Sequence, residues 1–290
     1  MTSRQVHDIA AVYFDLDGTL LDDVRGAGDK QDRKGATRVG TAVRHVLSRL
    51  QNDGIRVGIA TGRMFQSARP YLDASGCDAP AILFNGARVA DPHTNEAYFQ
   101  AHLDQGAARL ALEAAGRLGL HVNLYREDRY FMDSDDEWAR AFIAKETYDP
   151  HWVASLADLL DRDPVKLLLI GVSERLDECR RELEERFGRL AVLVFSEPEF
   201  LEVLPSGMSK ADGLLRACRV LGIRPEQVAA FGDGPNDSDM LMRAGIGVAV
   251  ANARPEVKAA ADIVAPFAGS KGVIWALQQI FSGLDVVHEA

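Results

Sequence analysis

Residues 10–23 read AAVYFDLDGTLLDD, a short apolar run that ends on two carboxylates and a glycine. The apolar run predicts a strand over Ile9–Phe14. In an open parallel sheet, ligands bind beyond the carboxyl ends of the strands, which is where Asp15 and Asp17 would stand. Because Asp-x-Asp pairs are common in ordinary turns, this stretch by itself does not separate a functional site from a turn.

Length and composition narrow the class of protein. A chain of 290 residues is long enough for about two domains with a substantial core. The net charge of −10 argues against non-specific binding to nucleic acid or to an anionic membrane, since both need a basic surface. We see no signal-peptide core, no apolar stretch near the roughly 18 residues of a membrane span, and no cysteine spacing for zinc or disulfides. We expect a cytoplasmic protein, monomer or homodimer, with no nucleic-acid or membrane partner.

Both ends of the chain alternate short apolar strands with helical patterns, which is typical of βαβ units and a parallel sheet. We expect strands at Ile9–Phe14, Ile55–Ala60, Ala81–Phe84, Val228–Phe231 and Ile246–Val250, and helices at Val39–Asn52, 65–75, Met208–Leu221, Asp237–Ala244 and Gly272–Phe281. The middle has a mixed α+β order, with a predicted hairpin over Arg88–Gln100 and a helix over Asp104–Leu118. We therefore expect an α/β protein with a parallel core of residues 1–85 and 203–290, and an inserted α+β domain of residues 86–202.

Two further segments could bind a phosphoryl group. Thr61, Gly62 and Arg63 directly follow a predicted strand, and a hydroxyl and a glycine amide at a strand end can hold a phosphoryl oxygen. A turn is the simpler interpretation of Thr-Gly alone. Lys210 stands near the start of a predicted helix, where the helix dipole disfavours a cation. Such a conflict between preference and position points to function, although a solvated surface lysine is the simpler interpretation in isolation.

The stretch FGDGPNDSDM, residues 231–240, gathers acidic side chains after another predicted strand. Clustered carboxylates repel one another, so a bound cation is the economical explanation for Asp233 and Asp237. Oxygen ligands without a nearby histidine or cysteine favour Mg²⁺, and the spacing of an EF-hand is missing. A polar loop that caps a helix is the alternative, and it suits Asp239 better than the other two.

The segments DLDGTL, TGR, GMSK and GDGPNDSDM, in this order, resemble the haloacid dehalogenase (HAD) superfamily of phosphohydrolases. The insert between the second and third segments, with FNGA at residues 84–87, is similar to the type II cap of the Cof-like subfamily, subclass IIB. The resemblance covers most of the chain. It implies a Rossmann-like, three-layer core with a parallel sheet, and an inserted α+β cap domain.

The resemblance also implies catalytic and metal-binding roles. Asp15 would be the nucleophile that forms an aspartyl-phosphate, and Asp17 would be the general acid and base. The metal ligands for Mg²⁺ would be Asp15, Asp233 and Asp237, with Asp17 contributing through its backbone carbonyl. An acid at position 17 suits phosphate esters and makes a dehalogenase an unlikely match, because a halide leaves without a proton.

The remaining roles implied by the resemblance concern the phosphoryl group. Thr61, Gly62 and Lys210 would hold it, and Asn236 would orient Lys210 or the phosphoryl group. Asn85 would stand on the substrate side, near the entry to the cap.

We therefore expect a Mg²⁺-dependent phosphatase of a small phosphorylated metabolite, such as a sugar phosphate. A phosphomutase on the same scaffold and a non-enzymatic protein that binds a phosphorylated metabolite are the alternatives. The substrate and the cap residues that select it are not readable. The charged segment from Val24 to Val43 is either a surface loop or a flap that reaches the cap.

Overall fold

The computed structural model describes residues 9–21, 39–144, 146, 148–162, 164–281 and 283–284. Most of the segment from Val24 to Val43 lies outside these residues. The hypothesis that this segment is a flap therefore concerns residues that the structure does not describe. The chain divides into two compact units. We call residues 1–63, 68–99 and 209–290 the core unit, and residues 64–67 and 100–208 the insert unit.

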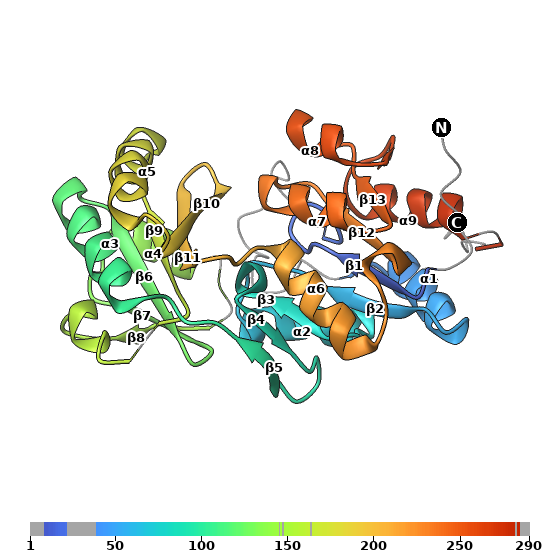
Figure 1. Ribbon diagram of the computed structural model, residues 1–290, viewed down its shortest axis with the longest axis horizontal. Coiled ribbons are helices and arrows are strands. Elements are labelled where there is room, and N and C mark those ends of the chain that lie inside the picture. The colour runs from blue at the N-terminus through green and yellow to red at the C-terminus, as the bar shows by residue number, and fades with distance from the viewer. Residues whose placement is uncertain are drawn as a thin grey trace. The chain divides into compact units, whose positions relative to one another are not determined.

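The core unit contains a parallel sheet of five strands in the order β14-β13-β12-β1-β2 (Figure 1). The strands are β1 (Ala11–Phe14), β2 (Arg56–Ile59), β12 (Val228–Gly232), β13 (Ile246–Ala249) and β14 (Ile263–Val264). In the middle of the sheet, Phe14 pairs with Ile59 on one side and with Phe231 on the other. β1, β2 and β12 therefore end at nearly the same level. The predicted α/β fold with a parallel sheet is confirmed.

Helices cover both faces of this sheet, which explains why β1 is apolar at every position and fully buried. The helices of the core unit are α1 (Thr41–Asn52), α2 (Phe65–Ser75, which begins in the insert unit), α6 (Lys210–Leu221), α7 (Ser238–Arg243), α8 (Pro255–Ala260) and α9 (Gly269–Ile280). One face packs Ala11 and Tyr13 against Leu214 and Leu241. α1 packs beside β2 and contacts α9. The short elements α8 and β14 were not predicted, because their apolar patterns are too brief to show a period.

A second, three-stranded sheet of the order β3-β4-β5 completes the strands of the core unit. It comprises β3 (Ala81–Leu83), β4 (Arg88–Ala90) and β5 (Ala97–Gln100), so the predicted hairpin is confirmed. A 3₁₀ turn, Phe84–Gly86, joins β3 to β4 with three positive φ angles in succession: 50°, 53° and 92°. A Cβ atom on Gly86 would lie 2.0 Å from the backbone carbonyl oxygen of Ser209. Glycine is therefore the residue that fits the third position of this turn without a clash.

Replacing Gly86 by alanine should destabilise the core unit by about 3 kcal/mol, because the strained φ and a clash with immobile backbone add together. The matched control is Gly54→Ala, since Gly54 has a similar φ of 84° and nothing within 4 Å of the added Cβ. That control should lose only about 1 kcal/mol. Urea unfolding of both variants measures the difference. Equal losses would show that the contact with Ser209 is unimportant.

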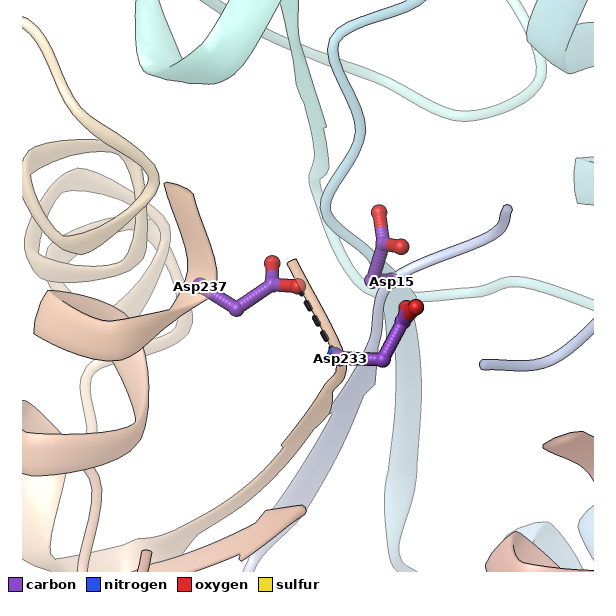
Figure 2. A group of neighbouring side chains, drawn as sticks. All are labelled: Asp15, Asp233 and Asp237. Atoms are coloured by element: carbon purple, nitrogen blue, oxygen red, sulfur yellow. Dashed lines mark hydrogen bonds between the residues drawn. The ribbon is translucent and has the colours of Figure 1, made fainter. Parts of the chain in front are cut away.

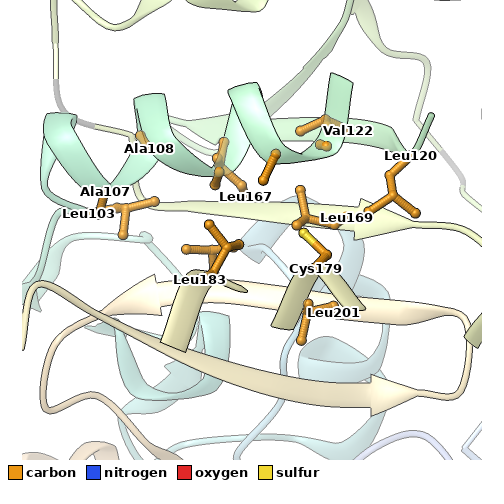
Figure 3. Close-up of a cluster of buried hydrophobic side chains, with 14 of the residues drawn as sticks. Leu103, Ala107, Ala108, Leu120, Val122, Leu167, Leu169, Cys179, Leu183 and Leu201 are labelled. Atoms are coloured by element: carbon orange, nitrogen blue, oxygen red, sulfur yellow. The ribbon is translucent and has the colours of Figure 1, made fainter. Parts of the chain in front are cut away.

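The insert unit has a six-stranded, mainly antiparallel sheet of the order β10-β11-β9-β6-β7-β8. Its strands are β6 (His121–Arg126), β7 (Arg129–Met132), β8 (His151–Trp152), β9 (Lys166–Ile170), β10 (Ala191–Glu197) and β11 (Phe200–Pro205), and its helices are α3 (Gln105–Leu118), α4 (Glu137–Ile143) and α5 (Ser173–Phe187). Residues of α3 and α5 pack on one face of the sheet around Leu167, Leu169 and Leu201 (Figure 3). The predicted α3 is confirmed: the Asp104 side chain caps it, and Gly119 ends it in the left-handed conformation.

The insert unit differs from the predicted range of residues 86–202: its main segment is 100–208, and residues 64–67 also belong to it. β4 and β5 share a sheet with β3, so residues 86–99 stay with the core unit. β11 pairs with β9 and β10, so the chain leaves the insert unit only after Met208. Strand pairing, which cannot be read from the sequence, therefore keeps β4 with the core unit and β11 with the insert unit. Within the described part of the chain, no helix has both the length and the apolar character needed to cross a bilayer.

Candidate active site

The acidic motifs of the core unit meet beyond the carboxyl ends of β1 and β12. Asp15 follows β1 directly and Asp233 follows β12 directly. The Asp15 amide donates to the Phe231 carbonyl (2.9 Å), which continues the pairing of the two strands up to the site. Figure 2 shows the carboxylates of Asp15, Asp233 and Asp237 gathered at these strand ends. The edge of the sheet predicted to bind ligands is where the structure brings these residues together.

Lys210 lies between two of these carboxylates. Its Nζ donates to Asp15 Oδ1 and to Asp237 Oδ1, each at 2.6 Å. Lys210 is the first residue of α6, after the cap residue Ser209, and its side chain is only 1% exposed. Burial by itself favours the neutral amine, but the charges of Asp15 and Asp237 outweigh it and raise the pKa of Lys210. These two ion pairs explain why a lysine occupies a helix start that the dipole disfavours.

The site carries an excess of negative charge. Burial raises the pKa of Asp15 well above its ordinary value, opposed by Lys210 and reinforced by the neighbouring carboxylates. Burial also raises the pKa of Asp233 to about 6, against the stabilising hydrogen bond from Thr19. Raised carboxyl pKa values mean that the folded protein resists ionising these groups. A bound cation would relieve that resistance.

The carboxylates can supply such a cation with ligands. One oxygen each from Asp15, Asp233 and Asp237 lies within 4.8 Å of the others. Asp237 is held in place by the amides of Asp233 (3.0 Å) and Gly234 (2.9 Å), which donate to its Oδ2. Three carboxylates are hard oxygen ligands, so the donor set fits Mg²⁺. Asp239 is exposed and not part of this group.

Asp17 is close to this group, but its side chain has another partner. Its two carboxylate oxygens accept hydrogen bonds from Arg63 at 2.8 and 2.5 Å. Its charge is among those that raise the pKa values of Asp15 and Asp233, which places it near both. The side chains that could hold a metal ion together are therefore Asp15, Asp233 and Asp237, and any contribution of Asp17 to a metal would come from its backbone.

Hydrogen bonds through Asn85 link two of the predicted phosphate-binding residues, Thr61 and Asn236. Thr61 is buried, and its Oγ1 accepts a hydrogen bond from the backbone amide of Arg63 (3.2 Å), across Gly62. The Thr61 carbonyl accepts from the Asn85 amide (3.0 Å), so the turn after β3 is tied to this loop. Asn236 Nδ2 donates to Asn85 Oδ1 (2.9 Å). Asn236 thus contacts Asn85, whereas Lys210 bonds to the two aspartates. A role of Asn236 at the phosphoryl group stays a prediction.

Sequence reasoning missed Asn252, which connects three loops of the site. Its Nδ2 donates to the Gly18 carbonyl (2.8 Å) and to Asp233 Oδ2 (3.2 Å), and its Oδ1 accepts from the Gly269 amide (3.0 Å). Thr19 was also given no role, although its Oγ1 donates to Asp233 Oδ1 (2.8 Å). Asn252 follows β13 within three residues. The rule that located Asp15 and Asp233 beyond their strands would have indicated it.

Comparisons with known proteins identify the family and the fold of the chain. A family model described as haloacid dehalogenase-like hydrolase matches residues 12–277. An HMP-PP phosphatase of Yersinia pestis is 31% identical over 246 residues, which cover 84% of this chain and 85% of the relative. A solved haloacid dehalogenase-like hydrolase from Bacteroides thetaiotaomicron has a TM-score of 0.78 and 27% identity, and the match covers 94% of this chain and 100% of that one. A sugar phosphatase of HAD subclass IIB shares the fold, with a TM-score of 0.74, 24% identity, and coverage of 88% of this chain and 92% of that one.

The matched segment runs from β1 into α9 and so contains all four motifs and the whole insert unit. The fold likeness to a subclass IIB protein also spans most of the insert. The chain therefore belongs to the haloacid dehalogenase-like hydrolase family.

Proposed function

We propose that this protein is a Mg²⁺-dependent phosphatase that hydrolyses a small phosphorylated metabolite, such as a sugar phosphate, through an aspartyl-phosphate on Asp15. The observation that carries the proposal is the convergence of Asp15, Asp233, Asp237 and Lys210 at one edge of the sheet. Membership of a hydrolase family supports the reaction type, and a relative named HMP-PP phosphatase supports a small phosphorylated substrate.

The residues suggest a reaction in two steps. In the first, a carboxylate oxygen of Asp15 bonds to phosphorus, the ester bond to the leaving oxygen breaks, and Asp17 gives that oxygen a proton. In the second, a water molecule bonds to phosphorus, the bond from phosphorus to Asp15 breaks, and Asp17 takes the proton of the water. Asp15 is thereby regenerated and inorganic phosphate is released.

The other side chains balance charge and hold the phosphoryl group. Lys210 places a buried positive charge beside Asp15, where an anionic substrate must approach a carboxylate. Thr61 and Gly62 offer a hydroxyl and a backbone amide to phosphoryl oxygens. Mg²⁺ held by Asp15, Asp233 and Asp237 would supply further positive charge against the phosphoryl oxygens.

The experiment that tests the proposal is a hydrolysis screen with Mg²⁺ over sugar phosphates, nucleotides and HMP-PP, with inorganic phosphate as the readout. We expect phosphate release from at least one of these compounds. A phosphomutase would convert a sugar phosphate to its isomer without free phosphate. A binding protein would bind a compound tightly and release nothing, and either result would contradict the proposal.

Removing divalent metal should abolish turnover, and acid should weaken the binding of Mg²⁺. Because the pKa of Asp233 is about 6 in the metal-free protein, a proton competes with Mg²⁺ below that pH. The apparent affinity for Mg²⁺ should then fall by about tenfold per pH unit. Calorimetric titration with Mg²⁺ between pH 5 and 8 measures this effect. An affinity independent of pH across that range would contradict the assignment of Asp233 as a ligand.

The same pKa predicts how the stability of the metal-free protein depends on pH. The folded pKa of Asp233 lies above its ordinary value of 3.8, so the folded state binds more protons between the two values. The contribution of Asp233 to the free energy of unfolding should therefore fall as the pH rises from about 4 to above 6. Thermal unfolding in EDTA measures it, with Asp233→Asn as the variant that lacks the effect. The control is Asp239→Asn, a change at an exposed residue. This variant should keep the pH dependence of stability seen in the wild type.

A further inference from the structure

Arg63 contacts both carboxylate oxygens of Asp17. Its Nε donates to Oδ2 (2.8 Å) and its Nη2 to Oδ1 (2.5 Å). The Asp17 side chain is 56% exposed, whereas that of Arg63 is 27% exposed. A planar guanidinium that binds both oxygens sets the direction of a carboxylate as well as its distance. An exposed carboxylate that would otherwise rotate is thus held in one orientation.

Arg63 is itself fixed by contacts within the core unit. Its guanidinium carbon lies 5.2 Å from the centre of the Tyr71 ring of α2, in the range of a cation–π contact. Its backbone amide donates to Thr61 Oγ1 (3.2 Å), and its carbonyl accepts from the Phe84 amide (3.1 Å). Arg63 therefore links the position of Asp17 to the loop that carries Thr61.

We propose that Arg63 is a positioning residue, which holds the Asp17 carboxyl where it exchanges protons with the leaving group and with water. The inference rests on the proposed function, since it assigns Arg63 a role in both proton transfers described above. Asp17 gives a proton to the ester oxygen in the first step and receives one from water in the second. Arg63 forms no bond to the reacting atoms and acts only through Asp17.

A positioning role predicts a loss that depends on the leaving group. An alkyl phosphate needs a proton on its leaving oxygen, whereas p-nitrophenolate is a stable anion that leaves without one. For Arg63→Met, we expect kcat/KM to fall by about 10²-fold or more with glycerol 2-phosphate, in line with the contribution of general acid catalysis. With p-nitrophenyl phosphate, kcat/KM should stay within about fivefold of wild type, because that reaction does not need the acid.

The second step gives an independent readout. Without a placed base, the aspartyl-phosphate should hydrolyse slowly, so Arg63→Met should accumulate it. Rapid mixing with p-nitrophenyl phosphate should then show a burst of about one p-nitrophenolate per active site, followed by a slow steady state. Wild type should show a smaller burst and a faster steady state.

Three further variants test whether Arg63 affects activity only through its contact with Asp17. Arg63→Lys keeps the charge but loses the planar fork, so it should retain part of the activity on glycerol 2-phosphate. In an Asp17→Asn background, adding Arg63→Met should cost less than about twofold, because Arg63 then has nothing to position. The control is Arg69→Met, an exposed arginine of α2 that pairs with Asp73 and should behave like wild type.

Two results would overturn the inference while leaving the phosphatase intact. One is an equal loss of kcat/KM on both substrates, which would indicate that Arg63 binds substrate or supports the fold. The other is an additive loss in the Asp17→Asn background. Thermal unfolding of each variant shows whether it is folded, and Arg63→Lys carries the same comparison if Arg63→Met is not. A wild-type protein inactive on every phosphate ester would overturn the proposed function and this inference together.

Discussion

Replacing Asp15 by asparagine should abolish phosphate release, with a loss on the order of 10⁴-fold or more, while the protein stays folded. The carboxamide has nearly the same shape as the carboxylate but does not form an acyl phosphate with the substrate. Burial already raises the pKa of Asp15, so a neutral side chain is tolerated there. Lys210 keeps its second partner, Asp237, at 2.6 Å. We therefore expect a melting temperature at or slightly above that of wild type.

Steady-state assays with the best substrate of the screen measure the loss for Asp15→Asn. Mass spectrometry of acid-quenched wild type should show one added phosphoryl group, and the variant should show none. Asp239→Asn is the control, because Asp239 is an exposed aspartate that is not part of the candidate metal-binding group. A variant at position 15 that works at the wild-type rate would rule out the covalent mechanism.

Replacing Lys210 by methionine should reduce both activity and stability. It removes the buried cation that lies between Asp15 and Asp237 and leaves two buried carboxylates without it. Breaking a buried ion pair from one side costs about 3–5 kcal/mol, and loss of the charge at the phosphoryl site should lower kcat by about 10³-fold. Urea unfolding in EDTA at pH 7 and steady-state kinetics measure the two losses.

The destabilisation of Lys210→Met should shrink under two conditions. Added Mg²⁺ should restore part of the free energy of unfolding, because under the proposed function it binds the folded site and not the unfolded chain. Acid should do the same, because Asp15 has a raised pKa and loses its charge by taking up a proton as the pH falls. Lys271→Met, at an exposed position of α9, is the control and should be unaffected. An unchanged free energy of unfolding for Lys210→Met would mean that Lys210 is not the counter-ion of the two aspartates.

Much of the fold could be predicted because its signals are local. The apolar run of β1, the periodic helix α1 and the turn chemistry that ends α3 each lie within a dozen or so neighbouring residues. The rule that ligands bind beyond parallel strands predicts Asp15, Thr61 and Asp233 as site residues from the sequence alone. The helix α8 and the two-residue strands β8 and β14 were missed, since they are too short for a periodic pattern.

The contacts between side chains within the site could not be predicted in the same way, because they join residues that are far apart in the sequence. Lys210 was predicted to hold the phosphoryl group, but its contacts with Asp15 and Asp237 join residues from three different elements. The pairs of Asp17 with Arg63, of Asn85 with Asn236 and of Asn252 with Gly18 were not predicted at all. Each of these contacts depends on the conformation of a loop, and loop conformations cannot be predicted from hydrophobic periodicity.

The sequence by itself determined the α/β class, the parallel core and the presence of an insert, and it predicted the residues that would carry the chemistry. Burial patterns and motifs are properties of short segments, so they can be recognised in the sequence without knowledge of the fold. Only the tertiary structure decided where the main segment of the insert begins and ends, because strand pairing keeps β4 with the core unit and all of β11, up to Pro205, with the insert unit. It alone decided that Arg63 holds Asp17, because that contact requires the ends of β1 and β2 to lie side by side in register.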